Sequence, residues 1–419
     1  MTSERFTVAI LFLLAACGGG ERPVSSVTTS IDREGDTVEV AIRGTPGPLE
    51  AIRAVEEVRI APASEDTSLF TEVYDFEVDN DGRFWVFDRP TGSIFLFAPD
   101  GKLLRRVGRR GGGPGEFQSS NGMEPRADGG IVVLDAQNAR ISFLDSAGAL
   151  ETSWRVPAGF STTRGLERDA EGTLYLRRPV TDPAPGDILG RMGLVRLKPG
   201  GDFADSLVPP DLGVVREAYV ATNGNGENRS MSATRARHSA QPLEAWQPAG
   251  GFVAGNGGTG QLIVARPGAK PVRITRDMPA VPIEEAERDG ERARITYSMR
   301  RTQKDWSWSG PELPSTKAPF RNLQVTRDGR LWVTVAVPSE RIPDDELQVS
   351  NDPERPVEHF RTPTVFEVYE PTGEFVGRLE CGNGFTLIDA DGDRLWAIVR
   401  DELDLPGIVR FRLEIPAKP

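Results

Sequence analysis

Residues 81–87 read Asp-Gly-Arg-Phe-Trp-Val-Phe, a glycine-bearing turn that leads directly into an aromatic strand. The same arrangement recurs along the chain, each time as a turn with glycine in its second position followed by an apolar run. The six turns are Asp81-Gly82, Asp128-Gly129, Glu171-Gly172, Gly250-Gly251, Asp328-Gly329 and Asp391-Gly392. A supersecondary unit repeated in this way predicts a radial or stacked array.

The first copy shows what one repeat contains. An alternating run at 74–78 leads to the turn, and a second run at 84–88 follows it. Two further runs, at 94–97 and 102–107, flank a second turn at 99–101. Short alternating runs separated by Asp-Gly turns are the strongest local signal for antiparallel hairpins. Six repeats of four antiparallel strands predict an all-β, six-bladed β-propeller.

The sixth copy lacks its fourth strand. Three runs, at 385–389, 395–399 and 408–413, complete the pattern, and the sequence then ends. One more strand-like run, Val55 to Ile60, stands before the first copy. We predict that this N-terminal strand completes the sixth blade and closes the ring, because closure removes open sheet edges that invite aggregation.

The distances between the turns locate insertions. The first three copies lie close together, whereas the later ones are far more widely spaced. We therefore expect a propeller over residues 55–415 with insertions at 179–191, 209–243, 276–319 and 339–362. Propeller topology places the short Asp-Gly turns on one face and all four insertions on the other. Loops held by a rigid scaffold commonly carry function, so we predict that the insertion-bearing rim is the binding face.

One insertion has helical character. Residues 283–301 are rich in charge and favour a partial helix, which Gly290 is expected to interrupt. Trp306 and Trp308 follow, and two interpretations are open for them. They either pack the insertion against the rim or form a platform for a ligand.

The N-terminus predicts export. Arg5 precedes an apolar stretch from residue 6 to residue 16, which is shorter than the roughly 20 residues needed to cross a membrane. Leu14-Ala15-Ala16-Cys17 resembles the bacterial lipobox. The alternative is an ordinary signal peptide followed by an unrelated cysteine.

The lipobox resemblance implies a signal peptide at 1–16, lipidation of Cys17, and a tether with an N-terminal extension at 17–54. Within that segment, residues 18–36 are expected to be flexible. Gly18 after the cysteine favours the outer membrane. Once Cys17 is acylated, Cys381 has no partner left, so the exported domain is expected to hold together without a disulfide.

Bulk composition limits the classes of partner. The chain has 419 residues, with 50 Lys and Arg against 62 Asp and Glu, a net charge of -12. This acidity argues against nucleic acid, which requires a basic patch. The 45 glycines and 33 prolines suit a turn-rich all-β protein.

A glycine-rich stretch carries a family resemblance. Residues 108–117 (Gly-Arg-Arg-Gly-Gly-Gly-Pro-Gly-Glu-Phe) link the first two repeats, and Asp135, Asn138 and Arg140 follow the second strand of the second repeat. Together these motifs resemble the NHL-type propellers, specifically the bacterial six-bladed β-propeller lipoproteins. The resemblance covers roughly residues 55–415 and implies the fold. It does not select a function, because such propellers serve as binding platforms and as lyases or lactonases.

The glycine-rich stretch does not fit a phosphate-binding loop, which must run into a helix N-terminus. We expect instead a sharp crossing between two blades with Phe117 wedged between them. Asp135 and Asn138 are expected to bond their own turn, and Arg140 to pair with an acid of a neighbouring blade.

The candidate binding rim combines residues of the inter-blade crossing, arginines near the same face and the two insertion tryptophans. It comprises Arg89, Arg109, Arg110, Glu116, Asn138, Arg140, Arg178, Trp306 and Trp308. Such arginines suit an anionic glycan or a carboxylate, or they are paired with the abundant acids of the chain.

Catalytic motifs are scarce. His238 and His359 are the two histidines, too few for a three-ligand zinc site, and the chain has no Gly-x-Ser-x-Gly motif. We therefore predict a lipid-anchored propeller without cofactor that binds an envelope protein or glycan. The alternative is a divalent-metal lactonase or lyase with Ca²⁺ held by channel oxygen ligands, although no spacing singles out a set. A third interpretation is a scaffold subunit of an envelope complex.

Overall fold

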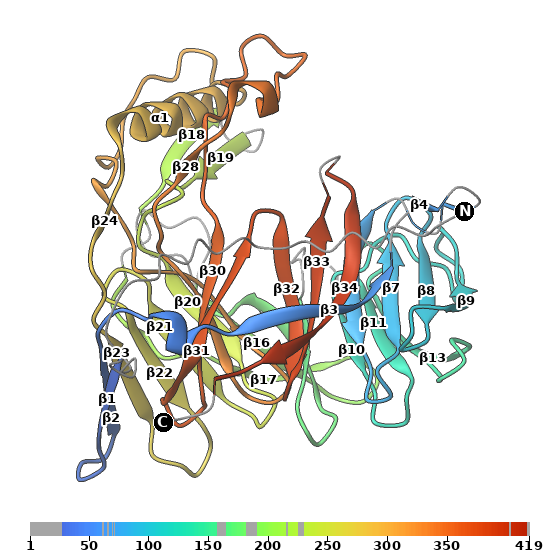
Figure 1. The fold of residues 1–419 in the computed structure, drawn as a ribbon. Helices are drawn as coiled ribbons and strands as arrows, with labels where there is room; N and C mark the ends of the chain where they lie inside the picture. The colour runs from blue at the N-terminus through green and yellow to red at the C-terminus, as the bar shows by residue number, and fades with distance from the viewer. Residues whose placement is uncertain are drawn as a thin grey trace, which may run out of the picture.

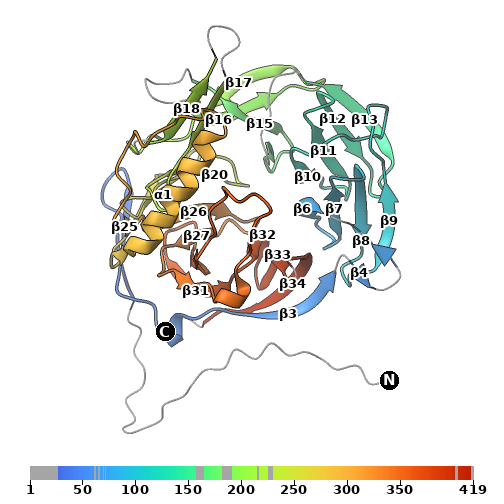
Figure 2. The same ribbon diagram turned by 90° about the horizontal axis from the view of Figure 1, so that it is seen from above.

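The computed structural model describes residues 27–60, 63–64, 67–68, 70, 72–156, 165–181, 191–214, 217–224, 230–401 and 404–416. Six β-sheets stand around a central axis like the blades of a propeller (Figure 1, Figure 2). The predicted all-β, six-bladed fold is confirmed. The predicted signal peptide and Cys17 lie outside the described residues. In the part of the chain that is described, no helix has the length and apolar character needed to cross a bilayer.

The first three blades each consist of four consecutive antiparallel strands, ordered from the centre outward (Figure 2). Their strands are β6 (Val73–Val78), β7 (Phe84–Asp88), β8 (Ser93–Phe97) and β9 (Leu103–Val107) in blade one; β10 (Met123–Pro125), β11 (Ile131–Asp135), β12 (Arg140–Leu144) and β13 (Leu150–Arg155) in blade two; and β14 (Leu166–Arg168), β15 (Leu174–Pro179), β16 (Met192–Leu197) and β17 (Phe203–Leu207) in blade three.

The last three blades include strands from outside the repeat. Their strands are β20 (Pro242–Trp246), β21 (Phe252–Asn256), β22 (Gln261–Ala265) and β23 (Val272–Arg276) with β2 (Val38–Arg43) and β1 (Thr28–Asp32) in blade four; β26 (Phe320–Val325), β27 (Leu331–Val335), β30 (Thr364–Tyr369) and β31 (Phe375–Gly382) in blade five; and β32 (Phe385–Asp391), β33 (Arg394–Arg400), β34 (Pro406–Glu414) and β3 (Arg53–Ile60) in blade six.

The N-terminal strand β3 closes the ring, as predicted. It pairs antiparallel with β34, so that Ile60 lies opposite Ile408 and Arg53 opposite Glu414. Ile60 is buried in the cluster between blades six and one. The last blade therefore has four strands, and its outermost strand comes from the start of the fold.

The segment before β3 adds a feature that the sequence did not predict. Strand β2 pairs parallel with the outer strand β23 of blade four, with Val40 opposite Ile274, and β1 folds back on β2. Val40 and Ile42 are buried against blades four and five. After a short 3-10 helix, η1 (Pro48–Glu50), Ala51 forms a bridge with Arg378 of blade five.

Residues 28–60 thus run along the outer edges of blades four, five and six (Figure 2). The expectation of a flexible tether at 18–36 is wrong for its described part, because residues 28–32 form β1. The polar composition of this segment concealed the alternating run 38–42, which is the part that packs on the core.

The core lies between neighbouring blades. Every residue of β7, β8 and β11 is buried. A middle strand is covered on both faces by adjacent blades, so its sequence is continuously apolar instead of alternating. The turn glycines before the second strands have φ values from 60° at Gly392 to 95° at Gly251, a conformation that glycine adopts without steric cost.

The insertions form a raised structure on one face, above blades four and five (Figure 1). Its elements are the hairpin β18 (Tyr219–Asn223) and β19 (Ser230–Thr234), the pair β24 (Val281–Pro282) and β25 (Thr316–Lys317), helix α1 (Glu285–Arg300), the pair β28 (Glu340–Arg341) and β29 (Phe360–Arg361), and the 3-10 helix η3 (Asp344–Glu346). A further short pair, β4 (Ala63–Ser64) and β5 (Thr67–Ser68), precedes blade one.

Helix α1 corrects one expectation, since it continues through Gly290 without interruption. Ile295 and Met299 are fully buried beneath the helix, and this tertiary packing outweighs the roughly 1 kcal/mol that a glycine costs inside a helix. The middle of the insertion expected at 179–191 lies outside the described residues.

Candidate functional site

The glycine-rich crossing is built around Phe117. Its ring is fully buried and packs edge-on against Phe87, with 6.3 Å between ring centroids. A Cβ atom at Gly108 would stand 2.7 Å from the Phe117 ring, so the close approach requires glycine there. The stretch leads into strand β10 and not into a helix, which agrees with its interpretation as a crossing.

Predicted rim residues hold this crossing together. The carboxylate of Glu116 accepts hydrogen bonds of 2.8 Å from the Gly113 amide and from Arg109 Nε, and these contacts lower the pKa of Glu116. Asn138 donates to the carbonyl of Gly111 at 2.9 Å. Arg140 donates to the Glu116 carbonyl at 2.5 Å. The expected pairing of Arg140 with an acid of a neighbouring blade is wrong, because backbone carbonyls of the crossing occupy it.

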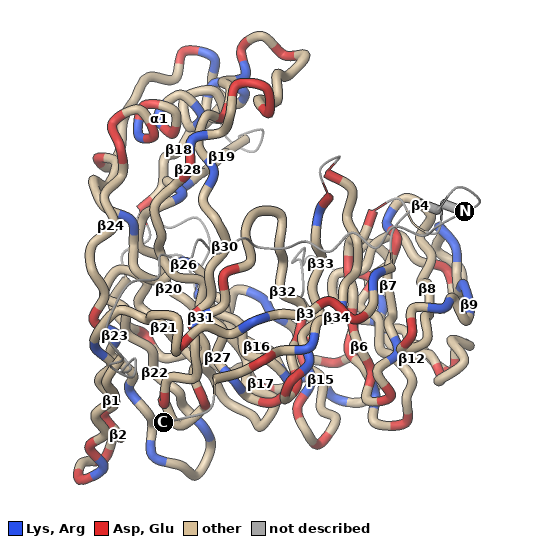
Figure 3. Tube along the Cα trace, in the orientation of Figure 1, with Lys and Arg blue, Asp and Glu red and all other residues tan. Residues whose placement is uncertain are grey.

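The remaining rim arginines lie apart from one another. Arg89 stacks over Tyr74 in blade one, and Arg178 stacks over Phe203 in blade three. Arg110 is exposed beside the crossing. Lys and Arg are interspersed with Asp and Glu along the described trace (Figure 3). The structure thus distributes these residues over three blades and does not gather them into one site.

The two tryptophans pack the insertions. Trp306 is 3% exposed and donates from Nε1 to the carbonyl of Val220 at 2.9 Å. Trp308 lies against Tyr219, with 4.6 Å between ring centroids, and Arg292 covers it at 5.1 Å. The two interpretations left open for these tryptophans were packing of the insertion and a platform for a ligand. The observed contacts are those of packing.

Ion pairs join three insertions that are far apart in sequence. Arg237, just after β19, forms a two-bonded pair with Glu358, with both distances 2.6 Å. The backbone amide of Arg237 also donates to Glu291 on α1 at 2.9 Å. Tyr297 on α1 donates to Asp352 at 2.7 Å. These contacts hold the three insertions in one arrangement.

A cavity of about 310 Å³ lies between these insertions and the top of blade five. Its walls come from the segment after β19, from α1, from the start of β26 and from the loop that leads into β29. They include both histidines of the chain and a group of charged side chains: Arg237, His238, Glu287, Arg288, Glu291, Arg321, Glu358, His359 and Arg361.

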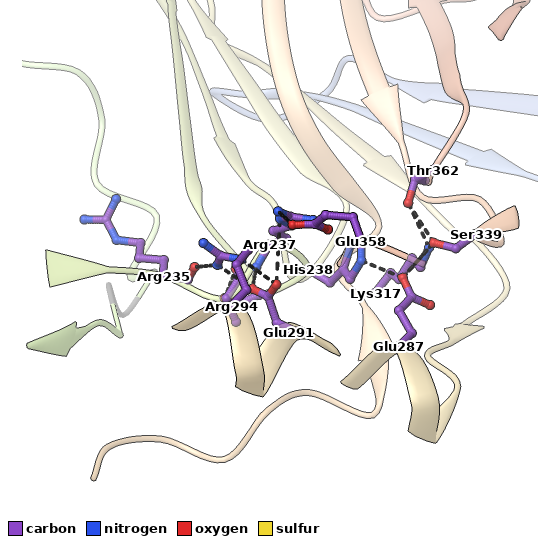
Figure 4. A network of polar contacts seen from close by, with 12 residues as sticks. Arg235, Arg237, His238, Glu287, Glu291, Arg294, Lys317, Ser339, Glu358 and Thr362 are labelled. Atoms are coloured by element: carbon purple, nitrogen blue, oxygen red, sulfur yellow. Dashed lines mark hydrogen bonds and ion pairs between the residues drawn. The ribbon is translucent and has the colours of Figure 1, made fainter. Parts of the chain in front are cut away.

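A compact polar cluster forms one wall (Figure 4). Glu287 of α1 is at its centre, and its Oε1 lies 2.9 Å from His238 Nε2 and 3.5 Å from Lys317 Nζ. Ser339 Oγ donates to the same oxygen at 2.6 Å. Lys317 donates to Ser339 at 2.6 Å and to Thr362 at 3.3 Å. Lys317 and Ser339 support the wall from behind, whereas His238, Glu287 and Thr362 face the cavity.

Arg321 is one of two cations of the cavity wall, with Arg288, whose side chains have no hydrogen-bond or ion-pair partner among the described residues. It is the extra residue of a β-bulge, since Phe320 and Asn322 pair with successive residues of β27 and Arg321 does not. Such bulges redirect a side chain next to functional sites. Among the described residues, the Arg321 side chain has no hydrogen-bond or ion-pair partner, and its Nε is buried. Burial lowers the pKa of Arg321, yet a guanidinium stays charged.

The cluster therefore carries an excess of positive charge. Glu287 pairs with Lys317, and Glu291 and Glu358 are engaged by Arg237, so these pairs leave no glutamate of the wall for Arg321. Burial also lowers the pKa of Lys317 and that of His238. A buried cation is costly unless an anion pairs with it.

The described atoms leave a second polar group of this wall unsatisfied, because His238 Nδ1 is buried without a partner. The side chain as a whole is 10% exposed and lines the cavity. From the sequence, His238 was considered only as a zinc ligand, and two histidines are too few for such a site. The other members of its cluster come from positions 287, 317, 339 and 362, so no local spacing in the sequence indicates the cluster.

The innermost strands carry a second group of acids around the axis. They occupy the same register on four blades: Glu77 opposite Trp85, Glu124 opposite Val132, Glu167 opposite Tyr175 and Asp389 opposite Trp396. Burial, with Glu77 and Glu167 nearby, raises the pKa of Glu124 well above its usual value. The sequence contains a signal for three of these acids. Glu77, Glu124 and Glu167 each precede the turn glycine of their repeat by the same number of residues.

Arg327 already pairs with one of the channel acids, which reduces the carboxylates available to a metal ion. Its Nε donates to Asp389 at 2.5 Å, and its guanidinium also reaches backbone carbonyls of blade one. Over the described residues, no three His, Cys, Asp or Glu side chains are placed to hold a metal ion. The channel acids are thus not arranged as a metal-ligand set.

Comparison with known proteins agrees with this architecture. Residues 60–157, which span the first two blades, match the family described as 6-bladed beta-propeller. The chain is a six-bladed β-propeller. Its inner-strand acids and its insertion cavity are then features that this chain builds on a common scaffold. Comparison with the curated protein sequences gives no match.

Several solved structures align with most of the chain at low identity. A candidate exported protein of Bacteroides fragilis shares 11% identity over 87% of this chain and 95% of its own, with a TM-score of 0.45. A protein of Bacteroides vulgatus shares 12% over 88% and 99%, with a TM-score of 0.46. Virginiamycin B lyase of Staphylococcus aureus shares 11% over 86% and 98%, with a TM-score of 0.36. At such identities the likeness concerns the fold alone.

Proposed function

We propose that this propeller is an exported, lipid-anchored protein of the bacterial envelope that binds an envelope glycan or protein through its insertion rim. The cavity beneath α1 is the binding site. The observation that carries the proposal is Arg321, a cation directed by a β-bulge into a cavity in which the described residues offer it no partner. An anionic group of a ligand would complete the site.

Two further features support a preformed binding site. The insertions are joined across the cavity by Arg237 and its acids, so the walls are fixed before a ligand arrives. Rigid sites bind more tightly because less conformational entropy is lost on binding. The aromatic cluster around Trp306 holds the same insertions from the outer side.

Binding is favoured over chemistry at this site. Ser339 contacts Lys317 as in a nucleophile–base pair, but both residues lie behind the cavity wall and do not line the cavity. The alternative of a Ca²⁺-dependent lactonase or lyase would use the channel acids, and no arrangement of these acids favours it over binding.

The binding proposal can be tested by capture of envelope material. The full chain, immobilised on a surface, is expected to retain a glycan or protein from a solubilised envelope fraction. The Arg321→Gln variant should retain at least about ten times less, because it removes one charge-assisted contact. Arg301→Gln removes the same charge from the exposed end of α1, outside the cavity, and should retain as much as the wild type. Equal retention by both variants would exclude the cavity as the binding site.

The anchor is a separate part of the proposal and has its own test. Labelling cells with a radioactive fatty acid should mark the wild-type chain and leave Cys17→Ser unlabelled. The outer-membrane assignment predicts that the label sediments with outer-membrane vesicles. Label found in inner-membrane vesicles would contradict this location and leave the lipidation itself supported.

A further inference from the structure

We infer that the cavity beneath α1 takes a small hydroxylated carboxylate of the sugar-acid class, with its carboxylate on Arg321 and a hydroxyl group on His238 Nδ1. This inference rests on the proposed binding function and specifies the chemistry of the ligand. It follows from what the unpartnered atoms of the wall can accept or donate.

The anion is a carboxylate because of the charges around Arg321. A guanidinium presents parallel N–H groups that fit a carboxylate or a phosphate in a two-bonded geometry. Glu287, Glu291 and Glu358 line the same cavity and would repel a doubly charged phosphate. The cavity lining contains four arginines, Arg321 and Arg288 among them, against these three glutamates, an excess of one positive charge. A single negative charge balances it.

The hydroxyl group follows from the tautomer of His238. Glu287 Oε1 also accepts a hydrogen bond from Ser339 and faces Lys317 Nζ, so it is an acceptor and His238 Nε2 is the donor in their 2.9 Å contact. Lys317 and Arg321 nearby disfavour a second proton on this ring. Nδ1 of the neutral ring is then an acceptor in need of a donor. An ammonium group would be repelled by the same two cations, whereas a neutral hydroxyl group is not.

The dimensions of the cavity set the size of the ligand. A volume of about 310 Å³ is near the lower end of the range for small-molecule sites, on the order of 300–1,000 Å³. A single sugar acid or the terminal sugar acid of a longer chain meets this limit. Both carry a carboxylate beside several hydroxyl groups, so the free compound and the glycan end share the chemistry that the wall recognises.

Titration calorimetry of the full chain with sodium D-glucuronate tests the inference. We expect saturable one-site binding, with D-glucose at least about ten times weaker, because it lacks the group that pairs with Arg321. Arg321→Gln should lose about ten-fold or more in affinity for glucuronate, and Arg301→Gln should keep it. Equal affinity for glucose and glucuronate, or an unaffected Arg321→Gln variant, would overturn the inference.

The role of His238 is tested with a ligand that has no hydroxyl group. Cyclohexanecarboxylate keeps the ring size and the charge, and should bind the wild type about ten times more weakly than glucuronate. His238→Phe should reduce this difference to less than about two-fold. If that variant does not fold, the comparison of the two ligands on the wild type still decides, and equal affinities contradict the contact with His238.

A third arm separates this inference from the proposed function and distinguishes the two sources. Tighter binding of a uronic-acid oligomer than of the monomer would identify a glycan end, and the reverse would identify the free sugar acid. If envelope material is captured in an Arg321-dependent manner while no sugar acid binds, the ligand class is wrong and the binding function stands. If neither is captured or bound, both proposals fail.

Discussion

Arg276 and Glu367 form an ion pair between blades four and five that is closed off from solvent. Arg276 Nε lies 2.8 Å from Glu367 Oε2 and Arg276 Nη2 lies 3.0 Å from Oε1, with the two side chains 1% and 0% exposed. Tyr369 donates a further hydrogen bond of 2.5 Å to the same carboxylate. Since Arg276 ends the last repeat strand before the insertion that contains α1, the pair joins the start of this insertion to blade five.

Replacing Arg276 by leucine should therefore destabilise the fold by about 3–5 kcal/mol, because Glu367 would be left charged and buried. Arg273→Leu on the same strand is the matched control. Arg273 pairs with Glu39 near the surface, and its loss should cost less than about 1 kcal/mol. Denaturant unfolding of both variants measures the difference, and similar losses would contradict the special cost of the buried pair.

The closing strand β3 should contribute through its buried end. Ile60→Ala is expected to lower the free energy of unfolding by about 2–4 kcal/mol, because Ile60 is 3% exposed in the cluster between blades six and one. Val55→Ala on the same strand should cost less than about 0.5 kcal/mol, since Val55 is 40% exposed. The thermal unfolding midpoint reports both. Comparable shifts would mean that strand pairing alone, and not burial, closes the ring.

Glu124 in the channel should destabilise the protein at neutral pH. Its folded pKa is raised by burial and by Glu77 and Glu167, so the folded state holds a proton that the unfolded state releases above the usual value of 4.5. Stability then falls as pH rises from 4.5 through the folded pKa. Glu124→Gln should remove this fall and raise stability at pH 7 by on the order of 1 kcal/mol.

The matched control for the channel is Glu171→Gln, which lies in an exposed turn of blade three. Unfolding free energies measured from pH 4 to pH 8 should keep the wild-type slope in this variant. A Glu124→Gln variant that is less stable than the wild type at pH 7 would show that the ionised carboxylate is needed in the channel.

His238 should impose the opposite pH dependence. Burial and the adjacent Lys317 and Arg321 lower the pKa of His238 despite its contact with Glu287, so the folded state resists a proton that the unfolded chain takes up below about 6.5. Stability falls as pH drops from 6.5 through the folded pKa. His238→Gln should flatten the unfolding free energy between pH 5 and 7, and the exposed His359→Gln should not. An unchanged slope in His238→Gln would contradict a buried neutral ring.

The sequence predicted the elements whose residues are neighbours in the chain. Asp81-Gly82 and its five counterparts predicted turns with positive φ. The run that ends at Ile60 was predicted as a strand that has no partner next to it in the sequence. The predicted rim failed to come together because Arg89, Asn138 and Arg178 each satisfy contacts within their own part of the ring. Residues at a fixed spacing in the repeat form contacts within that repeat, and these three residues do so.

The cavity could not be predicted in the same way. His238, Glu287 and Lys317 come close to Arg321 of blade five only because two irregular insertions fold over this blade. The bulge that redirects Arg321 has no signature in a single sequence. Strand β2 was missed for a related reason, since its parallel partner β23 is more than two hundred positions away and no turn joins them.

The path of residues 28–60 also determines how the propeller responds to a mechanical load. A pull on the N-terminal side enters the fold through β1 and β2, far from the strand β3 that closes the ring. Five successive residue pairs, from Val38 with Val272 to Ile42 with Arg276, join β2 to blade four along its length. A load directed along β2 would strain these pairs together, and the bridge at Ala51 lies between them and the closing strand. The ring can thus be held by its N-terminal end while its closure stays unloaded.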